Sequence, residues 1–161
     1  MKIYKIAQSY NIMYHNTDKS NDFLIEQNGL KINTEDWGKT TNAQEYIVRI
    51  YGMKPIFLSL NPELFKGSND ITLKINSNGL DIVADIPSVS DLGAYYGDND
   101  EGMWFSENNI PPQLINLVDE NGMIYYNDML NTNSPVAKAC IEATQTAACL
   151  ESIPTTRITL I

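Results

Sequence analysis

The sequence predicts an α+β domain, in which short strands and short helices follow one another without a regular βαβ repeat. Apolar and polar residues alternate over residues 71–75, which is the period of a half-buried strand. Apolar residues recur at helical spacing over 42–51, which indicates an amphipathic helix. Because turn residues separate these short segments, antiparallel strands packed against helices fit the pattern better than a parallel sheet.

Strands are expected wherever a short apolar run lies between turn residues. Asn121-Gly122 is a strong hairpin signal between two of the later runs. Residues 87–102 show no period and are expected to form a long loop. The expected strands cover residues 2–7, 12–15, 55–60, 71–75, 80–86, 103–105, 115–118, 123–126 and 157–161.

Helices are expected where capping residues precede apolar residues at helical spacing. Asn42 with Glu45, or Thr41 with Gln44, can form a capping box at the start of one of them. Residues 61–63 (Asn-Pro-Glu) combine an N-cap residue, a proline at the first helical position and an acid, which predicts a short helix. The expected helices cover residues 20–28, 42–51, a short segment from 61, and 134–150.

The composition describes one acidic, compact domain, expected over residues 1–161. The chain has 11 Lys and Arg against 20 Asp and Glu, so its formal net charge is −9. A duplex-binding protein normally presents a basic face, so this charge argues against a duplex nucleic-acid partner and against a polybasic membrane anchor. The 43% of hydrophobic residues is too high for a disordered acidic tail.

Nothing in the sequence indicates a membrane or an oxidising compartment. No apolar run of signal-peptide length follows the N-terminal lysines, and no stretch approaches the roughly 18 apolar residues of a membrane-spanning helix. Cys140 and Cys149 would lie about 13 Å apart along a helix, too far for a disulfide, and neither has a histidine nearby to complete a zinc site. We therefore expect a cytoplasmic protein with two buried thiols and no bound metal.

His15 is the only histidine of the chain and lies at the end of an expected strand. Residues 14–17 (Tyr-His-Asn-Thr), followed by a short helix and Gly29-Leu30, resemble the opening of ADP-ribosyltransferase-like domains. These domains begin with Tyr-His-Gly-Thr/Ser on a strand, and the helix that follows ends in Gly-Leu. Gly29 is expected to supply the left-handed residue that ends the helix, with Leu30 packing back onto it.

Three later segments extend the resemblance in the same order. Residues 56–63 are similar to the family's aromatic-apolar-Ser strand leading into a helix, and 71–85 to a strand and acidic segment of the small rifamycin-modifying ADP-ribosyltransferases. Residues 110–115 resemble the Ile-Pro-x-x-x-Ile that often leads into a late strand. The likeness covers residues 4–118 and implies split antiparallel sheets with short flanking helices; the expected helix over 134–150 lies outside it.

The family cleaves the nicotinamide–ribose bond of NAD through an oxocarbenium-like transition state. The resemblance implies that His15 donates to the ribose hydroxyls, with Asn16 and Thr17 beside the dinucleotide. Phe57 falls where the family has a stacking tyrosine, and Ser59 ends the same motif, so both are expected in the cofactor site.

The developing positive charge on the ribose calls for a carboxylate. Asp85, with Asp81 as the alternative, falls near the acid of the rifamycin-modifying group, and Glu107 is a third candidate because it follows an expected strand. The resemblance thus implies an enzyme, an NAD-dependent mono-ADP-ribosyltransferase of the glycosyltransferase class, with NAD as its substrate. Few cations are placed to hold the pyrophosphate, so backbone amides are expected to help. The cations near the motifs are Lys19, Lys31, Lys39, Arg49 and Lys54.

Several alternatives stay open. Asn16 stands where the family has glycine and Phe57 lacks a hydroxyl, which allows a domain of the same fold that has lost catalysis and binds a protein partner. RNA 2′-phosphotransferases share the fold, but the chain has no second histidine for that chemistry. Tyr95-Tyr96 can hold a substrate ring or pack the long loop, and Trp104 is expected in the core. The acidic charge favours a protein or small-molecule acceptor over a nucleic acid.

Overall fold

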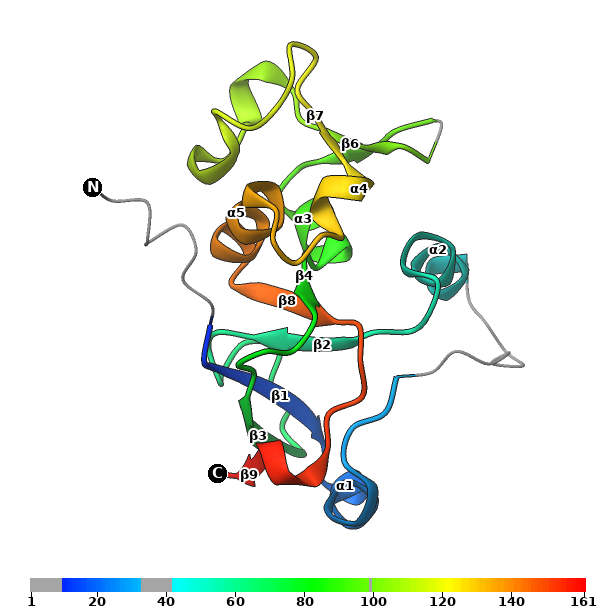
Figure 1. Ribbon diagram of the computed structural model, residues 1–161, viewed down its shortest axis with the longest axis vertical. Helices are drawn as coiled ribbons and strands as arrows, with labels where there is room; N and C mark the ends of the chain where they lie inside the picture. The colour runs from blue at the N-terminus through cyan, green and yellow to red at the C-terminus, as the bar shows by residue number, and fades with distance from the viewer. Residues whose placement is uncertain (1–9, 33–41, 99) are drawn as a thin grey trace. The chain divides into compact units, whose positions relative to one another are not determined.

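The computed structural model describes residues 10–32, 42–98 and 100–161 (Figure 1). It is a mixed α+β structure with antiparallel sheets, as the sequence predicted. The described chain divides into two compact units, which we call the β1 unit (residues 10–82 and 148–161) and the β6 unit (residues 83–147). The expected core over residues 4–118 therefore ends inside the β6 unit.

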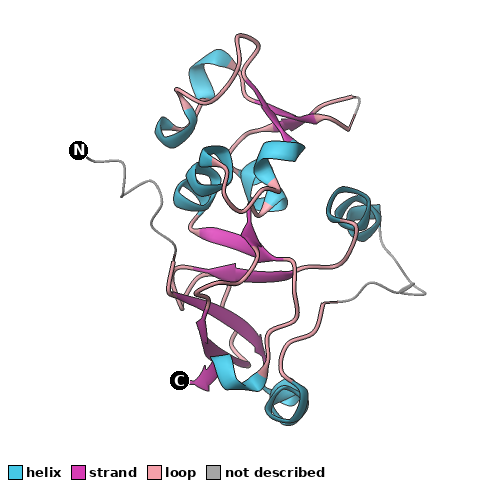
Figure 2. Cartoon of the chain, viewed as in Figure 1, coloured by secondary structure: helices cyan, strands magenta, loops and turns pink. Residues whose placement is uncertain are grey.

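The β1 unit is built on an antiparallel sheet. Its strands are β1 (Ile12–Asp18), β2 (Ile56–Ser59), β3 (Asp70–Asn76) and β9 (Ile158–Leu160), in the order β2-β1-β3-β9. The boundary between the units passes through β4 (Ile82–Val83) and β8 (Thr146–Cys149), which complete the sheet order as β4-β8-β2-β1-β3-β9. Figure 2 shows β1, β3 and β9 next to one another.

The register between β1 and β3 divides the side chains between the two faces of this sheet. The two strands pair along seven positions, with His15 opposite Leu73 and Tyr14 opposite Lys74. Because side chains alternate along a strand, His15 shares one face with Met13 and Leu73, both almost fully buried. Tyr14 and Lys74 lie on the other face.

The described part of the β1 unit also contains short helices. They are η2 (Lys19–Asn21), α1 (Asp22–Asn28), α2 (Asn42–Tyr51) and η5 (Thr155–Arg157). Gly29 ends α1 with a φ of 72°, as expected, and a Cβ at this position would overlap the carbonyl oxygen of Ile153. Leu30 is buried and forms a β-bridge with Ile153, which ties the end of α1 to the C-terminal segment (Figure 1).

The β6 unit packs short helices around a small sheet. Its strands are β5 (Tyr95–Tyr96), β6 (Gly102–Trp104) and β7 (Met123–Tyr125), all antiparallel. Its helices are α3 (Ile86–Asp91), η3 (Glu107–Asn109), η4 (Pro112–Leu114), α4 (Tyr126–Met129) and α5 (Pro135–Thr144). Phe105, Leu114, Ile124 and Cys140 are at most 1% exposed and belong to its core.

Many of the expected elements are confirmed. Strands form within or around 12–15, 55–60, 71–75, 103–105, 123–126 and 157–161, and helices within 20–28 and over 42–51. Ser134 caps its helix by accepting a hydrogen bond from the amide of Val136. The expected strand over 2–7 and the capping residue Thr41 lie outside the described residues.

The short helix expected from Asn61 is wrong, since residues 61–65 form a turn. The Asn61 side chain accepts from the amide of Glu63, as an N-cap would, but Phe65 then takes a left-handed φ of 60°. A left-handed residue at this position does not allow a helix to continue past the turn.

Two expectations for the middle of the chain are also wrong. Residues 87–102 are not one irregular loop, because α3 begins at Ile86 and β5 forms at Tyr95. Residues 115–118 form turns rather than a strand, so β7 pairs with β6 instead of forming the expected hairpin. The motif over 110–115 therefore leads into no strand. The same Ile-Pro-x-x-x-Ile spacing recurs at 153–158, where it leads directly into β9.

The helix expected over 134–150 is shorter than predicted. Gln145 takes a left-handed φ of 62° and ends α5, and the Thr144 hydroxyl donates to the carbonyl oxygen of Cys140. Residues 146–149 then form β8, whose side chains are all buried, so packing overrides their helical spacing. Cys140 and Cys149 are both free and buried, as expected. Among the described residues, no helix is long and apolar enough to cross a bilayer.

Candidate functional site

The imidazole of His15 links β1 to β2. Its Nδ1 atom lies 2.7 Å from the carbonyl oxygen of Phe57. A carbonyl oxygen can only accept a hydrogen bond, so Nδ1 carries the proton in this contact. Among the described residues, Tyr14 of β1 pairs with Ser59 of β2. The hydrogen bond from the His15 side chain to Phe57 is a second contact between these two strands.

Burial sets the charge of this imidazole. Desolvation lowers the pKa of His15 below its ordinary 6.5, and the Phe57 carbonyl and the Asp70 carboxylate oppose that shift without cancelling it. The ring is therefore neutral at pH 7, with a proton on Nδ1 and a lone pair on Nε2. In this state the unprotonated Nε2 could accept a hydrogen bond, whereas the expected donation to a ribose hydroxyl would need a protonated ring nitrogen and stays a prediction.

Thr17 lies on the same face of β1 as His15 and borders a hollow of about 350 Å³. Its Oγ1 accepts from the Asn21 amide at 3.0 Å, which leaves the hydroxyl proton for another partner. Among the described residues of the lining, Lys31 is the one with a charge. The hollow is lined by Thr17, Asn21, Leu24, Ile25, Asn28, Gly29, Leu30 and Lys31.

Asn16 has a structural role on the opposite face of β1. Its Nδ2 donates to the carbonyl oxygens of Pro62 and Leu64, at 2.8 and 3.1 Å, and its Oδ1 accepts from Thr72 at 2.6 Å. These bonds fix the turn after β2 against the sheet. Asn16 is extended within β1, so the left-handed turn that glycine would favour does not arise here.

Phe57 and Ser59 do not turn their side chains toward His15. Ser59 is opposite Tyr14, so alternation places both Ser59 and Phe57 on the face opposite His15. The Phe57 ring packs edge-on against Tyr51 at 6.2 Å, and the buried Ser59 hydroxyl donates to the Asn61 carbonyl oxygen. Phe57 thus reaches His15 through its backbone oxygen rather than its ring.

The three candidate acids are divided between the two units. Asp85 and Glu107 belong to the β6 unit, and Asp81 belongs to the β1 unit. Asp85 is 4% exposed and caps α3, accepting from the amide and the hydroxyl of Ser88. Burial raises the pKa of Asp85, against the opposing hydrogen bonds from Ser88 and Thr146. Its oxygens therefore already have a structural use. Glu107 is exposed in the first turn of η3.

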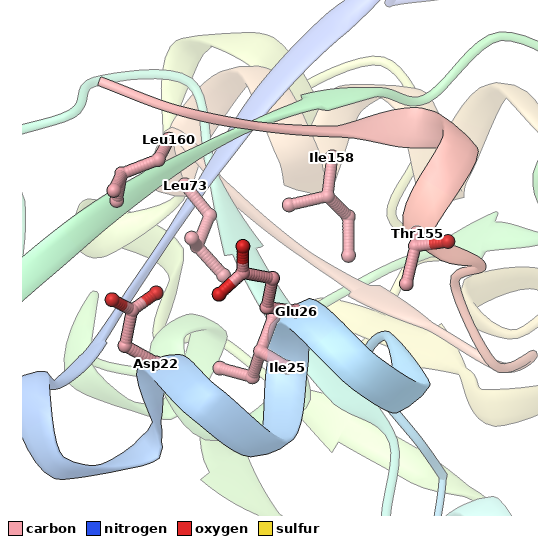
Figure 3. Close-up of a pocket in the computed structure, with 7 residues that line it drawn as sticks. All are labelled: Asp22, Ile25, Glu26, Leu73, Thr155, Ile158 and Leu160. Atoms are coloured by element: carbon pink, nitrogen blue, oxygen red, sulfur yellow. The ribbon is translucent and has the colours of Figure 1, made fainter.

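A second hollow, of about 320 Å³, lies on the His15 face between α1 and β9 (Figure 3). Leu73 and Ile158 form an apolar floor, while Asp22 and Glu26 rise from α1 at its side. Leu73 is the direct cross-strand partner of His15, which fixes the hollow to this face. The lining combines apolar and acidic groups, so it does not suit a phosphate. It consists of Asp22, Ile25, Glu26, Leu73, Thr155, Ile158 and Leu160.

The sequence interpretation missed an aromatic surface on the β6 unit. Tyr95 and Trp104 pair across β5 and β6 with their rings stacked 4.6 Å apart, and they are 54% and 38% exposed. The expected place of Trp104 in the core is wrong. Side chains alternate along a strand, so Met103 and Trp104 had to lie on opposite faces of β6. Met103 is the fully buried one, which leaves Trp104 on the exposed face. Tyr125 is also exposed and donates its hydroxyl proton to Asp119.

No group of His, Cys, Asp or Glu side chains suited to a metal ion occurs in the part of the chain that the structure describes. Comparison of the chain with family models, with curated proteins and with solved structures gave no match.

Proposed function

We propose that the protein is a transferase that cleaves the glycosidic bond of a dinucleotide. The resemblance of its ordered motifs narrows this class to an NAD-dependent mono-ADP-ribosyltransferase. The observation that carries the proposal is the hydrogen bond from His15 Nδ1 to the Phe57 carbonyl oxygen, which fixes the ring and leaves Nε2 as an acceptor.

In this proposal β1 binds the nicotinamide-side ribose. A ribose hydroxyl donates to Nε2 of His15, and the Thr17 hydroxyl binds a neighbouring sugar or phosphate oxygen. Lys31, in the hollow beside Thr17, is placed to neutralise one phosphate charge. A single lysine does not balance a pyrophosphate, so backbone amides supply the remaining donors.

The reaction would break the bond between C1′ of the ribose and the nicotinamide nitrogen. Nicotinamide leaves with the bonding electron pair, and the acceptor forms the new bond to C1′ and gives up a proton. A carboxylate stabilises the positive charge that develops on the ribose. The resemblance proposes Asp85 or Glu107 for this role, with Asp81 as the alternative. Glu107 is exposed and has no capping role, and Asp81 belongs to the same unit as His15.

The acceptor is proposed to be a protein or a small molecule. With a formal charge of −9 the chain repels a polyanionic nucleic acid and attracts a basic protein surface.

The test is release of nicotinamide from NAD with a mixture of basic proteins as acceptors, together with the thermal stability of the protein at millimolar NAD. The wild-type chain should release nicotinamide and be stabilised by NAD, and His15→Ala should lose both effects. Asp22→Ala, which removes a half-buried carboxylate in α1, is the matched control. Absence of both effects in the wild-type chain would overturn the proposal.

A second candidate is a domain of the same fold that binds a protein partner without catalysis. The exposed Tyr95–Trp104 stack favours it, because exposed aromatic side chains are enriched at protein interfaces. The capping role of Asp85 favours it too. Nicotinamide release that disappears in His15→Ala would exclude this candidate.

A further inference from the structure

A third hollow, of about 480 Å³, lies on the face of the β1-unit sheet opposite His15. Lys74 is placed on that face by its pairing with Tyr14 on β1 and with Thr159 on β9. The residues that the structure describes in this lining include two cations and no carboxylate, although acids outnumber cations 20 to 11 in the chain. It consists of Asn11, Ile12, Lys74, Asn76, Thr156, Arg157 and Thr159.

The Arg157 guanidinium is held in place at this hollow. Its Nη1 donates to the carbonyl oxygens of Asn76 and Asn78, at 2.9 and 2.7 Å. These two contacts join the C-terminal segment to the turn after β3. They leave the Nε and Nη2 protons with no other hydrogen bond among the described residues, so a positioned donor group with its full charge remains for a ligand.

The neighbouring side chains are also set up to donate. The Oδ1 atom of Asn76 accepts from the amide of Asn78 at 3.2 Å, so the Nδ2 group of Asn76 is the free end of that side chain. Thr156 and Thr159 add hydroxyls, and Lys74 adds an exposed ammonium directly opposite Thr159. Donors of this kind, with two positive charges, select an anion with several acceptor oxygens.

We propose that this hollow binds the phosphate group of a small organic phosphate, between the Lys74 ammonium and the Arg157 guanidinium. A volume of about 480 Å³ is in the range of small-molecule sites, and Ile12 offers an apolar contact for the organic part. The net charge of −9 opposes a polyanion such as RNA, which favours a small ligand. The site stands apart from the proposed ribose site, because it uses the other face of the sheet.

Two acids act against Arg157 at a neighbouring group. Arg157 lowers the pKa of the buried Cys149 thiol, whereas Glu151 and Asp81 raise it, and neither acid lines the hollow.

The test is calorimetric titration of the full chain with pyrophosphate, at an ionic strength held constant with sodium chloride. Lys74→Gln should weaken binding about tenfold, the effect of losing one charge-assisted hydrogen bond. Lys66→Gln is the matched control, because it makes the same change of net charge at an exposed lysine outside the hollow. Lys74→Arg should keep most of the affinity.

Equal losses in Lys74→Gln and Lys66→Gln would overturn the proposal, because they would show only a net-charge effect. Absence of pyrophosphate binding by the wild-type chain, or tighter binding of a single-stranded oligonucleotide, would overturn it too. Lys31→Gln tests the hollow beside Thr17, where the proposed function has a phosphate bind, so pyrophosphate binding there and binding beside Lys74 are separate outcomes.

Discussion

The Nδ1 atom of His15 and the carbonyl oxygen of Phe57 lie 2.7 Å apart, and this contact joins β1 to β2 next to their registered pair. His15 therefore has a structural role through Nδ1, and its Nε2 is a candidate group for binding a ligand. The backbone of Phe57 fixes the ring, and burial keeps the ring neutral. The first two predictions test these consequences.

Replacing His15 with Ala should lower nicotinamide release at least about a hundredfold, because the ribose loses the group that orients it. Since His15 also links two strands, the variant should lose some thermal stability. His15→Gln, whose side-chain amide can still donate to the Phe57 carbonyl, should regain stability without regaining full activity. Nicotinamide release and thermal unfolding measured together separate the two roles; equal recovery of both in His15→Gln would contradict this account.

The lowered pKa of His15 makes stability depend on pH in one direction. Between the folded pKa and 6.5 the unfolded chain binds more protons at His15 than the folded chain does. The contribution of this group is therefore complete above pH 6.5 and is lost as the pH falls through that window. Urea unfolding between pH 5 and 8 should show a slope that His15→Gln removes; the same slope in both proteins would count against it.

Asp85→Asn separates capping from catalysis. Asparagine is as good an N-cap as aspartate, so the fold should be kept, whereas Asp85→Ala should cost about 1 kcal/mol of unfolding free energy. The pKa of Asp85 is raised, so its stabilising contribution is present below pH 3.8 and declines as the pH rises through the folded pKa. Asp85→Asn should therefore be at least as stable as wild type at pH 7.

The activity of Asp85→Asn then identifies the acid. Loss of nicotinamide release with an intact fold would assign catalysis to Asp85. Retained release, with loss in Glu107→Gln, would assign it to Glu107.

Asn16→Gly introduces the residue that ADP-ribosyltransferase-like domains have in the motif that residues 14–17 resemble, yet it should not stabilise this protein. The variant loses the bonds to the carbonyl oxygens of Pro62 and Leu64 and to Thr72. The expected cost is about 1–3 kcal/mol of unfolding free energy, measured by urea denaturation. A stability equal to wild type would mean that the turn after β2 does not depend on Asn16.

Local patterns were enough to predict much of the β1 unit. The alternation at 71–75 and the Gly29 stop are local signals, and both led to correct elements. The start of α3 was missed, although Asp85 caps it and Pro87 lies in its first turn, a signal similar to the Asn61-Pro62 pair that was wrongly interpreted as a helix start. The segment after Asn61 differs from α3 in the left-handed backbone of Phe65, and no local sequence pattern predicts that conformation.

The rest depended on tertiary structure. In the sequence, residues 146–149 continue the helical spacing of apolar residues that begins in α5. In the structure they form strand β8, and all four side chains are buried. Asn16 looked like a departure within a binding motif, and its three partners lie more than 40 residues away in the sequence. The tautomer of His15 likewise follows from Phe57, which is 42 residues away.

Nitrogen-15 NMR of the histidine side chain tests the central claim most directly, because His15 is the only histidine, so both ring resonances belong to it, and their couplings to the carbon-bound ring protons distinguish Nδ1 from Nε2. At pH 7.5 the account predicts a proton on Nδ1 and none on Nε2, and a shift of the Nε2 resonance when NAD is added at millimolar concentration. A proton on Nε2 in the free protein, or ring resonances that NAD leaves unmoved, would contradict it.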